Sequence, residues 1–328
     1  MTYLVAGRIL LIEAYDDWSV SAVSQIFARW FLTALPNQST NESDVTVRIS
    51  CGATPPSLPT DLTGFDIGFG GTCHTDNSSY YVKFDRSLIV FTDRTSEVDL
   101  WVDHPCDVSS AKVTQLISHA LSPALRRCGV FEIHSAGVVP PGHDRAVMFA
   151  GPSGSGKSTL TSQLARSGWR YLSDDVLLLQ NCGNEISVGP LRRFFALTSE
   201  TIAAVKLSKI VPKETSGPWK ARITPHEHFD SAPIEEAKVG SIIFPNIMRE
   251  PRSSLRRVTP AKTMTRLLRL CPWASYDKPT SSEHLSTLAH LSNSAAAFVL
   301  NAGTDILNEP QLTTELIQKC ISEPVLVR

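Results

Sequence analysis

The sequence has almost no net charge, because 31 Lys and Arg residues stand against 32 Asp and Glu residues in a chain of 328. Nucleic acids and anionic membranes attract proteins through a strong positive field, which this balance does not supply. We therefore expect neither a nucleic-acid nor a membrane partner. The hydrophobic fraction of 42% and the charged fraction of 19% are those of an ordinary globular protein.

Long apolar runs are also missing. No stretch approaches the roughly 20 apolar residues that span a bilayer. The opening MTYLVAGRILLIEAY is apolar, but Arg8 and Glu13 interrupt it, no basic start precedes it, and no small-residue cleavage site follows. This pattern is typical of a β-strand rather than of a signal peptide, so the sequence predicts a cytoplasmic protein.

Paired cysteine motifs are absent, since the seven cysteines are scattered and none forms a Cys-x-x-Cys pair. Such a set favours reduced thiols packed as small apolar residues. Cys73-His74 and His104 with Cys106 are metal-ligand types, but they lack the usual zinc-ligand spacing. We expect no zinc site there, and we interpret the His-Glu-His run at 226–228 as loop surface.

The length and the pattern of elements predict two domains, 1–128 and 129–328. The first 105 residues are strand-like, with alternating or β-rich runs separated by turn formers. A helical pattern over 109–129, with serines at its start and Arg-Arg-Cys-Gly at its end, marks the boundary. The sequence thus predicts a small β-rich domain ending in a helix, followed by a larger domain.

The larger domain alternates strand and helix patterns, which is typical of an α/β fold (α+β for the whole chain). Residues 213–231 are rich in Pro, Gly, His and charge, and indicate a long loop. The sequence predicts strands at 130–139, 145–151, 169–173, 238–247 and 294–303, a hairpin of 176–180 with 185–190, and helices at 158–168, 199–207 and 259–271.

Residues 151–158, GPSGSGKS, match the phosphate-loop pattern G-x-x-x-x-G-K-[ST] and lie between a predicted strand and a predicted helix. Its glycines let backbone N–H groups turn towards phosphate oxygens, and the helix adds its positive end. Lys157 is expected to reach the β- and γ-phosphates, and the Ser158 hydroxyl suits Mg²⁺. The predicted nucleotide-binding residues are Gly151, Ser153, Gly154, Ser155, Gly156, Lys157, Ser158 and Thr159.

Two adjacent aspartates, Asp174 and Asp175, end the strand that follows the phosphate-loop helix. If this strand runs parallel to the strand before the loop, its carboxyl end opens beside the phosphates. Neighbouring strand side chains point in opposite directions, so one acid can face a metal and the other the substrate. Phosphoryl transfer needs both roles. The alternative is an exposed turn in which one acid caps the backbone.

Over roughly residues 131–180 the chain resembles the catalytic domain of bacterial HPr kinase/phosphorylase and, more closely, HPr-kinase-like proteins with a different N-terminal domain. The resemblance rests on His134 in IHSAGVV, the loop GPSGSGKST, the run SGWRYLSDD and the hairpin after it. It implies a twisted P-loop sheet related to phosphoenolpyruvate carboxykinase and ATP-dependent phosphorylation of a protein serine. Some relatives phosphorylate a serine at the end of a lasso peptide.

By position, the resemblance implies catalytic roles for Lys157, Asp175 and His134. Asp175 would be the base that takes the hydroxyl proton, Ser158 and Asp174 would hold Mg²⁺, and His134 would line the cleft. A lone strand histidine is otherwise more often a packed core residue. The chain lacks the family's later Glu-Arg-Gly signature, and its first 105 residues do not match the classical regulatory domain, so neither the reverse reaction nor HPr as substrate is implied.

Four further cations have two interpretations each. Arg192 and Arg193 follow the hairpin and could bind an acidic group or lie in solvent at a strand end. Lys220 and Arg222 could close over a triphosphate and stabilise transition-state charge, or belong to an ordinary loop.

The leading hypothesis is a Mg-ATP-dependent kinase that phosphorylates a serine of a peptide or small protein. A kinase for a small-molecule alcohol would use the same residues, and the β-rich N-terminal domain favours a macromolecular substrate. A third hypothesis is a nucleotide-dependent binding module or NTPase switch, against which the adjacent acids argue. A homo-oligomer is left open.

Overall fold

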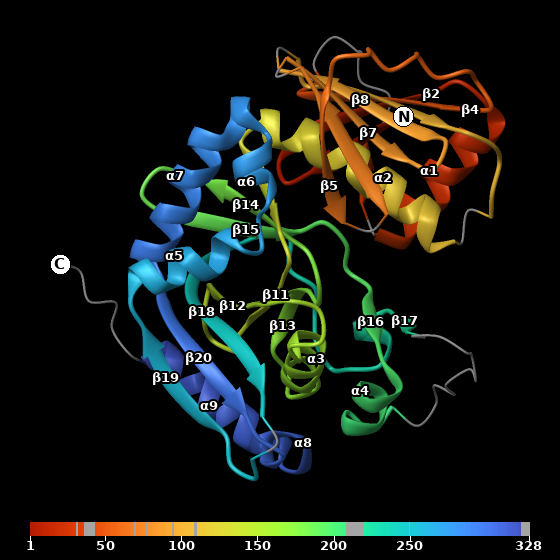
Figure 1. Cartoon of the computed structure of the whole chain (residues 1–328). Helices are drawn as coiled ribbons and strands as arrows, with labels where there is room; N and C mark the ends of the chain where they lie inside the picture. The colour runs from red at the N-terminus through yellow and green to blue at the C-terminus, as the bar shows by residue number, and fades with distance from the viewer. Residues whose placement is uncertain are drawn as a thin grey trace. The chain divides into compact units, whose positions relative to one another are not determined.

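The structure is a computed structural model that describes residues 1–30, 32–35, 43–68, 70–76, 78–93, 95–107, 110–207, 220–248 and 250–322. The chain forms two compact units, the first of residues 1–131 with 277–280 and the second of residues 132–276 with 281–328. Each unit builds its own sheet, coloured from red to yellow and from yellow-green to blue in Figure 1.

The first unit is a mixed nine-stranded sheet in the order β3-β1-β2-β4-β9-β8-β7-β6-β5, in which only the β2–β4 and β4–β9 pairs are parallel. Helices α1 and α2 contact each other and the strands around β4 (Figure 1). The elements are β1 (Thr2–Val5), β2 (Arg8–Ala14), α1 (Asp17–Trp30), β3 (Thr33–Leu35), β4 (Val45–Cys51), β5 (Thr63–Gly68), β6 (Gly71–Thr75), β7 (Ser79–Phe84), β8 (Ser87–Thr92), β9 (Glu97–Val102) and α2 (Ala111–Arg127).

Helix α1 corrects the prediction that the first 105 residues are all strand-like. Its buried residues include Val23, Ile26 and Trp30, which recur at helical spacing. The Asp16 carboxylate accepts hydrogen bonds from the Ser19 backbone N–H and the Ser19 hydroxyl, at 2.8 and 2.7 Å. These are helix-start contacts, so the helix has a local cause that the strand interpretation overlooked.

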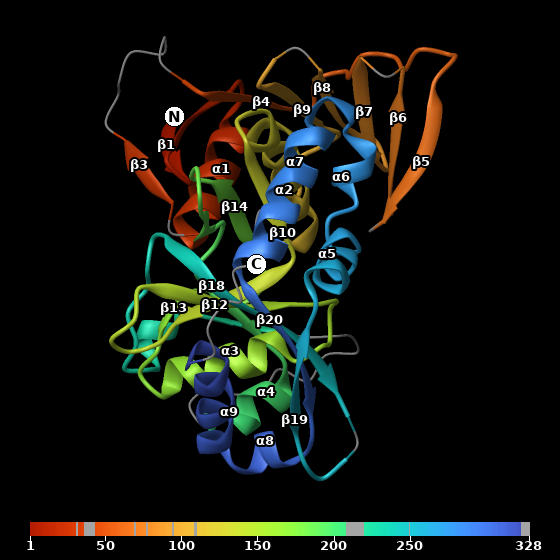
Figure 2. The ribbon, with the colours of Figure 1, turned by 90° about the vertical axis from the view of Figure 1, so that its left-hand side faces the viewer.

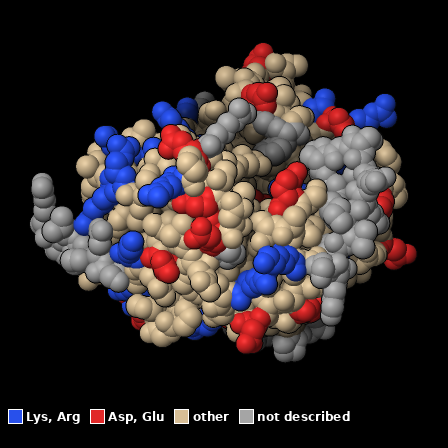
Figure 3. Space-filling model, turned by 90° about the horizontal axis from the view of Figure 1, so that it is seen from below, with Lys and Arg blue, Asp and Glu red and all other residues tan. Residues whose placement is uncertain are grey.

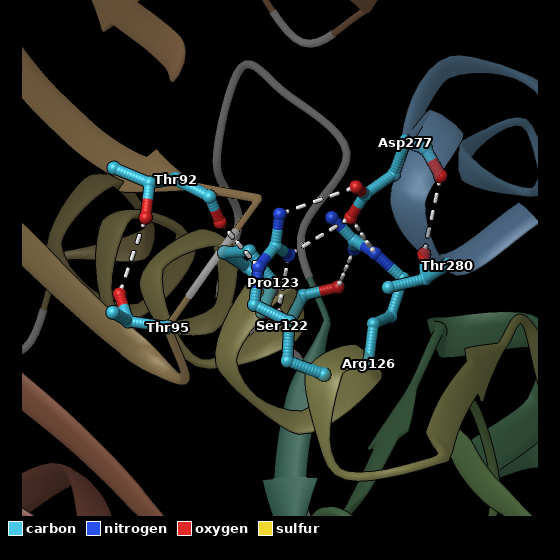
Figure 4. Close-up of polar contacts among 8 residues, drawn as sticks. Thr92, Thr95, Ser122, Pro123, Arg126, Asp277 and Thr280 are labelled. Carbon is cyan, nitrogen blue, oxygen red and sulfur yellow. Dashed lines mark hydrogen bonds and ion pairs between the residues drawn. The ribbon is translucent and has the colours of Figure 1, made fainter. Parts of the chain in front are cut away.

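Four residues far along the chain, 277–280, belong to the first unit, and one of them has a buried carboxylate. Asp277 Oδ2 lies 2.8 Å from Arg126 Nε and 3.1 Å from Arg127 Nη1. Figure 4 shows this cluster, in which Arg126 also donates to the Ser122 hydroxyl and Arg127 to the Thr92 carbonyl oxygen. Both arginines come from the last turn of α2, where positive charge is favourable.

The second unit has strands in the order β14-β15-β18-β12-β11-β13, with β20 paired to β18 and β19 to β20. Helices α3 and α9 contact each other and this sheet, and lie together beneath it in Figure 2. The elements are β11 (Ser135–Val139), β12 (Arg145–Ala150), α3 (Lys157–Arg166), β13 (Arg170–Ser173), β14 (Leu177–Asn181), β15 (Ile186–Pro190), β16 (Phe195–Leu197), α4 (Ser199–Ala204), β17 (Ala221–Ile223), the 3-10 turn η2 (Pro225–Glu227), β18 (Ala237–Ile247), β19 (Ser254–Val258), α5 (Pro260–Leu268), α6 (Trp273–Tyr276), α7 (Lys278–Ser294), β20 (Ala296–Ala302), α8 (Asp305–Asn308) and α9 (Pro310–Ser322). Strand β10 (Val130–Ile133) crosses the division between the units.

The direction of three strands positions the candidate site. Strands β12 and β13 both pair antiparallel with β11, so they run the same way and end at the same edge of the sheet. The start of β11 lies at that edge too. The end of β12 leads into the phosphate loop, the end of β13 into the two aspartates, and His134 precedes β11. The strand direction expected for the acids is therefore confirmed.

The second unit departs from the sequence predictions at β10 and β11, in the predicted loop, and at helices α7 and α9, which were not predicted. The strand predicted at 130–139 is two strands, β10 and β11, interrupted at His134. The loop predicted at 213–231 contains a short strand, β17, paired with β16, and the turn η2; residues 213–219 lie outside the described part. The predicted hairpin is confirmed as β14 and β15.

On the face seen in Figure 3, Lys and Arg side chains are interspersed with Asp and Glu, in keeping with the balanced composition. None of the helices in the described ranges is long and apolar enough to cross a membrane.

Candidate phosphate-binding and phosphoryl-transfer site

The phosphate loop connects β12 to α3 through two glycines in the left-handed region. Gly154 has φ +81° and Gly156 has φ +97°. Residues with a Cβ rarely adopt these angles, so glycine lets the loop turn tightly before the helix begins at Lys157. An added Cβ on Gly151 would lie 2.8 Å from Ser155 Oγ, which shows how closely the loop packs on itself.

Lys157 is buried at the first position of α3, and its ammonium group is fully engaged. Nζ donates to the carbonyl oxygens of Gly151 and Pro152 at 2.7 and 3.0 Å, and contacts His134 Nε2 at 2.8 Å. An ammonium group has three donors, so these partners use all of them. Burial, with the nearby charge of Lys220, lowers the pKa of Lys157 to about 8 despite the attraction of Asp174.

Asp174 is completely buried at the end of β13. Its Oδ2 accepts a hydrogen bond from the Ala196 N–H at 3.0 Å, while its Oδ1 has no partner in the described structure. Burial raises the pKa of this carboxyl group. A buried oxygen without a partner costs free energy, so Oδ1 is suited to a ligand that supplies positive charge.

Ser158 lies beside this acid, and its hydroxyl is 3.5 Å from the Asp174 carbonyl oxygen. The described residues contain no group of three or more His, Cys, Asp or Glu side chains that could hold a metal ion. Mg²⁺ does not need one, because it is usually held by one or two carboxylates together with substrate phosphates and water. The Ser158 hydroxyl and Asp174 Oδ1 therefore fit Mg²⁺ bound with a nucleotide.

Asp175 points to a different set of partners from Asp174. Its Oδ1 lies 3.2 Å from His134 Nδ1, and its Oδ2 forms an ion pair with Arg192 Nη2. The Asp175 side chain is 26% exposed, so it can be reached from solvent. The two adjacent acids follow β13 in a bend and have different partners, so the difference comes from the bend and not from alternation within a strand.

His134 connects the lysine to the second acid. Burial, followed by the charges of Lys157, Arg192 and Lys220, lowers the pKa of His134 to about 4. The ring is therefore neutral near pH 7. The contact with Lys157 assigns the tautomer: Nε2 accepts from the ammonium group, so the proton is on Nδ1, which lies 3.2 Å from Asp175 Oδ1.

Arg192 is the site residue that the sequence interpretation undervalued. The hairpin pairs Leu177 with Pro190, and continuing this register by two residues sets Asp175 opposite Arg192. The Leu191 N–H bonds the Val176 carbonyl oxygen at 3.5 Å, which shows that the register does continue. A hairpin predicted with its register would have identified the pair.

The other predicted residues lie in different surroundings. Arg193 forms an ion pair with the exposed Glu235. Arg222 and Arg192 each lie 5.3 Å from the centre of the Phe194 ring, so Arg222 is brought near the site. Lys220 is exposed, and its charge acts on His134, Lys157 and Asp174.

Three hydroxyls of the phosphate loop complete the predicted nucleotide-binding set. Ser153 is exposed, the Ser155 hydroxyl is buried without a partner in the described structure, and Thr159 shares a 2.8 Å hydrogen bond with Thr201. In the region predicted to be loop surface, His226 Nδ1 contacts the Tyr171 hydroxyl at 3.1 Å.

A separate cavity of about 1230 Å³ lies at the opposite edge of the same sheet. It is lined by residues from the start of β12, β18 and β20, including Arg145, Val239 and Ala296. These positions are at the other ends of the strands from the phosphate loop, so this cavity is not the phosphate site.

Comparisons with known proteins add little to this geometry. No protein-family model matches the chain, and no curated protein does. Among solved structures, the chain is similar to the Hpr(Ser) kinase/phosphatase from Coxiella burnetii, with 15% identity and a TM-score of 0.32, over 57% of this chain and 94% of that one. A TM-score this low does not show a common fold.

Proposed function

We propose that this chain is a Mg-ATP-dependent phosphotransferase that moves the γ-phosphoryl group of ATP to a hydroxyl, that of a serine in a peptide or small protein. The observation that carries the proposal is the partly exposed Asp175, joined through His134 to Lys157 beside the phosphate loop. Phosphoryl transfer needs positive charge around the phosphates and a group that takes the hydroxyl proton, and the site offers both.

The chain's own residues divide the work as follows. The loop N–H groups and Lys157 bind the phosphates, and the Ser158 hydroxyl with Asp174 Oδ1 holds Mg²⁺. Bound there, Mg²⁺ adds positive charge at the phosphate oxygens. Lys157 gives up some of its three present partners to contact phosphate.

Asp175 takes the proton. The acceptor oxygen forms a bond to the γ-phosphorus, the bond from that phosphorus to the bridging oxygen breaks, and its electron pair stays with the diphosphate. The hydroxyl proton goes to the Asp175 carboxylate. His134, neutral at pH 7, holds its Nδ1–H 3.2 Å from Asp175 Oδ1 and orients the carboxylate.

The test measures transfer of labelled γ-phosphate with Mg²⁺ and ATP. Four acceptor sets are compared: degenerate serine peptides, the same peptides with threonine or tyrosine, a panel of small alcohols, and water alone. We expect label in the serine peptides, and we expect Asp175→Asn to lower transfer by about 10²- to 10⁴-fold without weakening ATP binding. Asp144→Asn, an exposed acid before β12, is the matched control and retains activity.

Other outcomes separate the rival functions. Label in a small alcohol and in no peptide would assign a metabolite kinase with the same residues. Release of phosphate to water alone, with an Asp175→Asn variant that keeps its nucleotide-dependent behaviour, would assign a switch and overturn the proposal.

A further inference from the structure

Arg192 is a partly exposed cation of the site, and phosphate binding and proton transfer leave it without a role. Its side chain is 18% exposed, and its Nη2 forms an ion pair with Asp175 Oδ2. Its Nε is buried with no hydrogen-bond partner in the described structure. The guanidinium also lies over the Phe194 ring, which supports the plane of the group.

This ion pair opposes the role of Asp175. A carboxylate that accepts from a guanidinium is stabilised in its charged form and is a weaker proton acceptor. Its Oδ1 is at the same time occupied by His134 Nδ1. Both carboxylate oxygens of Asp175 are therefore engaged by other side chains of the site.

A γ-phosphate changes the competition for the arginine. Guanidinium groups bind phosphate through paired hydrogen bonds, and phosphate carries more charge than a carboxylate. The γ-phosphate would lie near Lys157, whose ammonium group shares the His134 ring with Asp175. Arg192 thus has a stronger anion available within the same site once a triphosphate is bound.

We propose that Arg192 is a latch on Asp175 that is released by the γ-phosphate. Without nucleotide it holds the Asp175 carboxylate; with a triphosphate it contacts the γ-phosphoryl oxygens, so that Asp175 Oδ2 becomes free to accept the hydroxyl proton. This inference rests on the proposed function. It makes Arg192 the residue that distinguishes ATP from ADP, and it restricts the proton acceptor to the state that holds a transferable phosphoryl group.

The first test is binding, which needs no acceptor. Isothermal titration with Mg²⁺ compares a non-hydrolysable ATP analogue with ADP in the wild type, Arg192→Ala, Arg192→Lys and Arg193→Ala. We expect Arg192→Ala to weaken binding of the analogue by about tenfold or more, as loss of a charge-assisted hydrogen bond does, and to change ADP binding much less. Arg192→Lys should weaken binding of the analogue less than Arg192→Ala does. The neighbouring Arg193→Ala should not change it.

A double-mutant cycle tests the latch itself. Asp175→Asn removes the competing carboxylate, so it should tighten binding of the ATP analogue severalfold when Arg192 is present and leave it unchanged in the Arg192→Ala background. Equal weakening of ATP-analogue and ADP binding by Arg192→Ala, or additive effects of the two substitutions, would show that Arg192 only supports the local structure. Should Arg192→Ala fail to fold, Arg192→Lys and Arg192→Gln carry the same comparison.

Phosphoryl transfer gives a second readout and separates the latch from the proposed function. Millimolar guanidinium should partly restore transfer in Arg192→Ala but not in Asp175→Asn. A wild-type chain that transfers phosphate together with an unimpaired Arg192→Ala overturns the latch and leaves the function standing. If the chain transfers phosphate to no acceptor but the double-mutant cycle gives the predicted binding changes, the proposed function is overturned. The proposed contact between Arg192 and the γ-phosphate then still stands.

Discussion

Two aspartates in this chain each lie against an arginine, and their surroundings differ. Asp277 is fully buried with Arg126 and Arg127, which are 2% and 6% exposed. Asp175 is 26% exposed and its partner Arg192 18%. A buried pair is costly to break because a charge is left without compensation, whereas a pair open to solvent can exchange partners. Although both clusters pair an aspartate with arginine, the Asp277 cluster is therefore suited to stabilising the fold, and the Asp175 cluster to exchanging its ion-pair partner.

The largest effect is expected at the open cluster. Asp175→Asn should lower kcat for phosphoryl transfer by about 10²- to 10⁴-fold, the usual contribution of a general base. The urea midpoint should stay the same or rise, because residues placed for activity are often not optimal for stability. Transfer rates and urea unfolding on one preparation check both. If Asp175→Asn kept full activity, the Asp175 cluster would have no catalytic role to set it apart from the Asp277 cluster.

The buried cluster should respond in the opposite way. Asp277→Ala leaves Arg126 and Arg127 without their carboxylate, so we expect the free energy of unfolding to fall by about 3–5 kcal/mol. Nucleotide binding by the folded fraction should persist. The control is Asp85→Asn, which removes an exposed pair with Lys112 and should leave the urea midpoint unchanged. If Asp277→Ala and Asp85→Asn changed the urea midpoint equally little, burial of an ion pair would not decide whether it stabilises the fold.

Two glycines with left-handed backbone angles extend the comparison to the phosphate loop. Gly156 has φ +97° in the loop, and Gly142 has φ +75° in a turn away from it. Alanine at either position should cost roughly 1–2 kcal/mol for the left-handed backbone. Only Gly156→Ala should also weaken nucleotide binding, as titration calorimetry would show. Loss of binding in both variants would indicate a general loss of folding instead.

Two histidines report on the two clusters separately and give the smallest effect. Burial, with the charge of Arg126, lowers the pKa of His119 to about 4; burial, with the charge of Lys157 and other cations, does the same for His134. Neither ring should therefore titrate near 6.5 in an NMR pH series. Between pH 6.5 and pH 4 the unfolded chain binds more protons at these two histidines than the folded chain does. The stability that each neutral ring contributes is therefore lost as pH falls from 6.5 towards 4.

Nucleotide distinguishes these two rings. Bound phosphates draw Lys157 away from His134, and their negative charge favours the protonated form of the His134 ring. The pKa of His134 should therefore rise, while that of His119 stays unchanged. Equal movement of both resonances would contradict separate clusters.

The part of the second unit around the phosphate loop could be predicted well because its signals are local, whereas helices α7 and α9 were not predicted. The phosphate loop, the strand before it and the helix after it follow from one short motif, and the hairpin from two apolar runs around Asn-Cys-Gly-Asn. In the first unit, α1 was missed although Val23, Ile26 and Trp30 have helical spacing. The error came from extending the strand pattern on either side of it.

Long-range contacts had no such signal. Nothing near Asp277 in the sequence indicates that it would join α2, about 150 residues earlier, because the pairing depends on tertiary packing. The roles of Asp174 and Asp175 were predicted from spacing and resemblance and stay predictions. Their environments, one fully buried and one open to solvent, required coordinates.

The β14–β15 hairpin has a consequence for how the chain tolerates insertions. Residues added to its turn would lengthen the loop without changing which residues face each other at the open end. A single residue added between Asp175 and Leu177, or between Pro190 and Arg192, would replace the arginine opposite the acid or turn it to the other face of the ribbon. Variation in length should therefore collect at residues 182–185, while the two short segments at the open end keep their length.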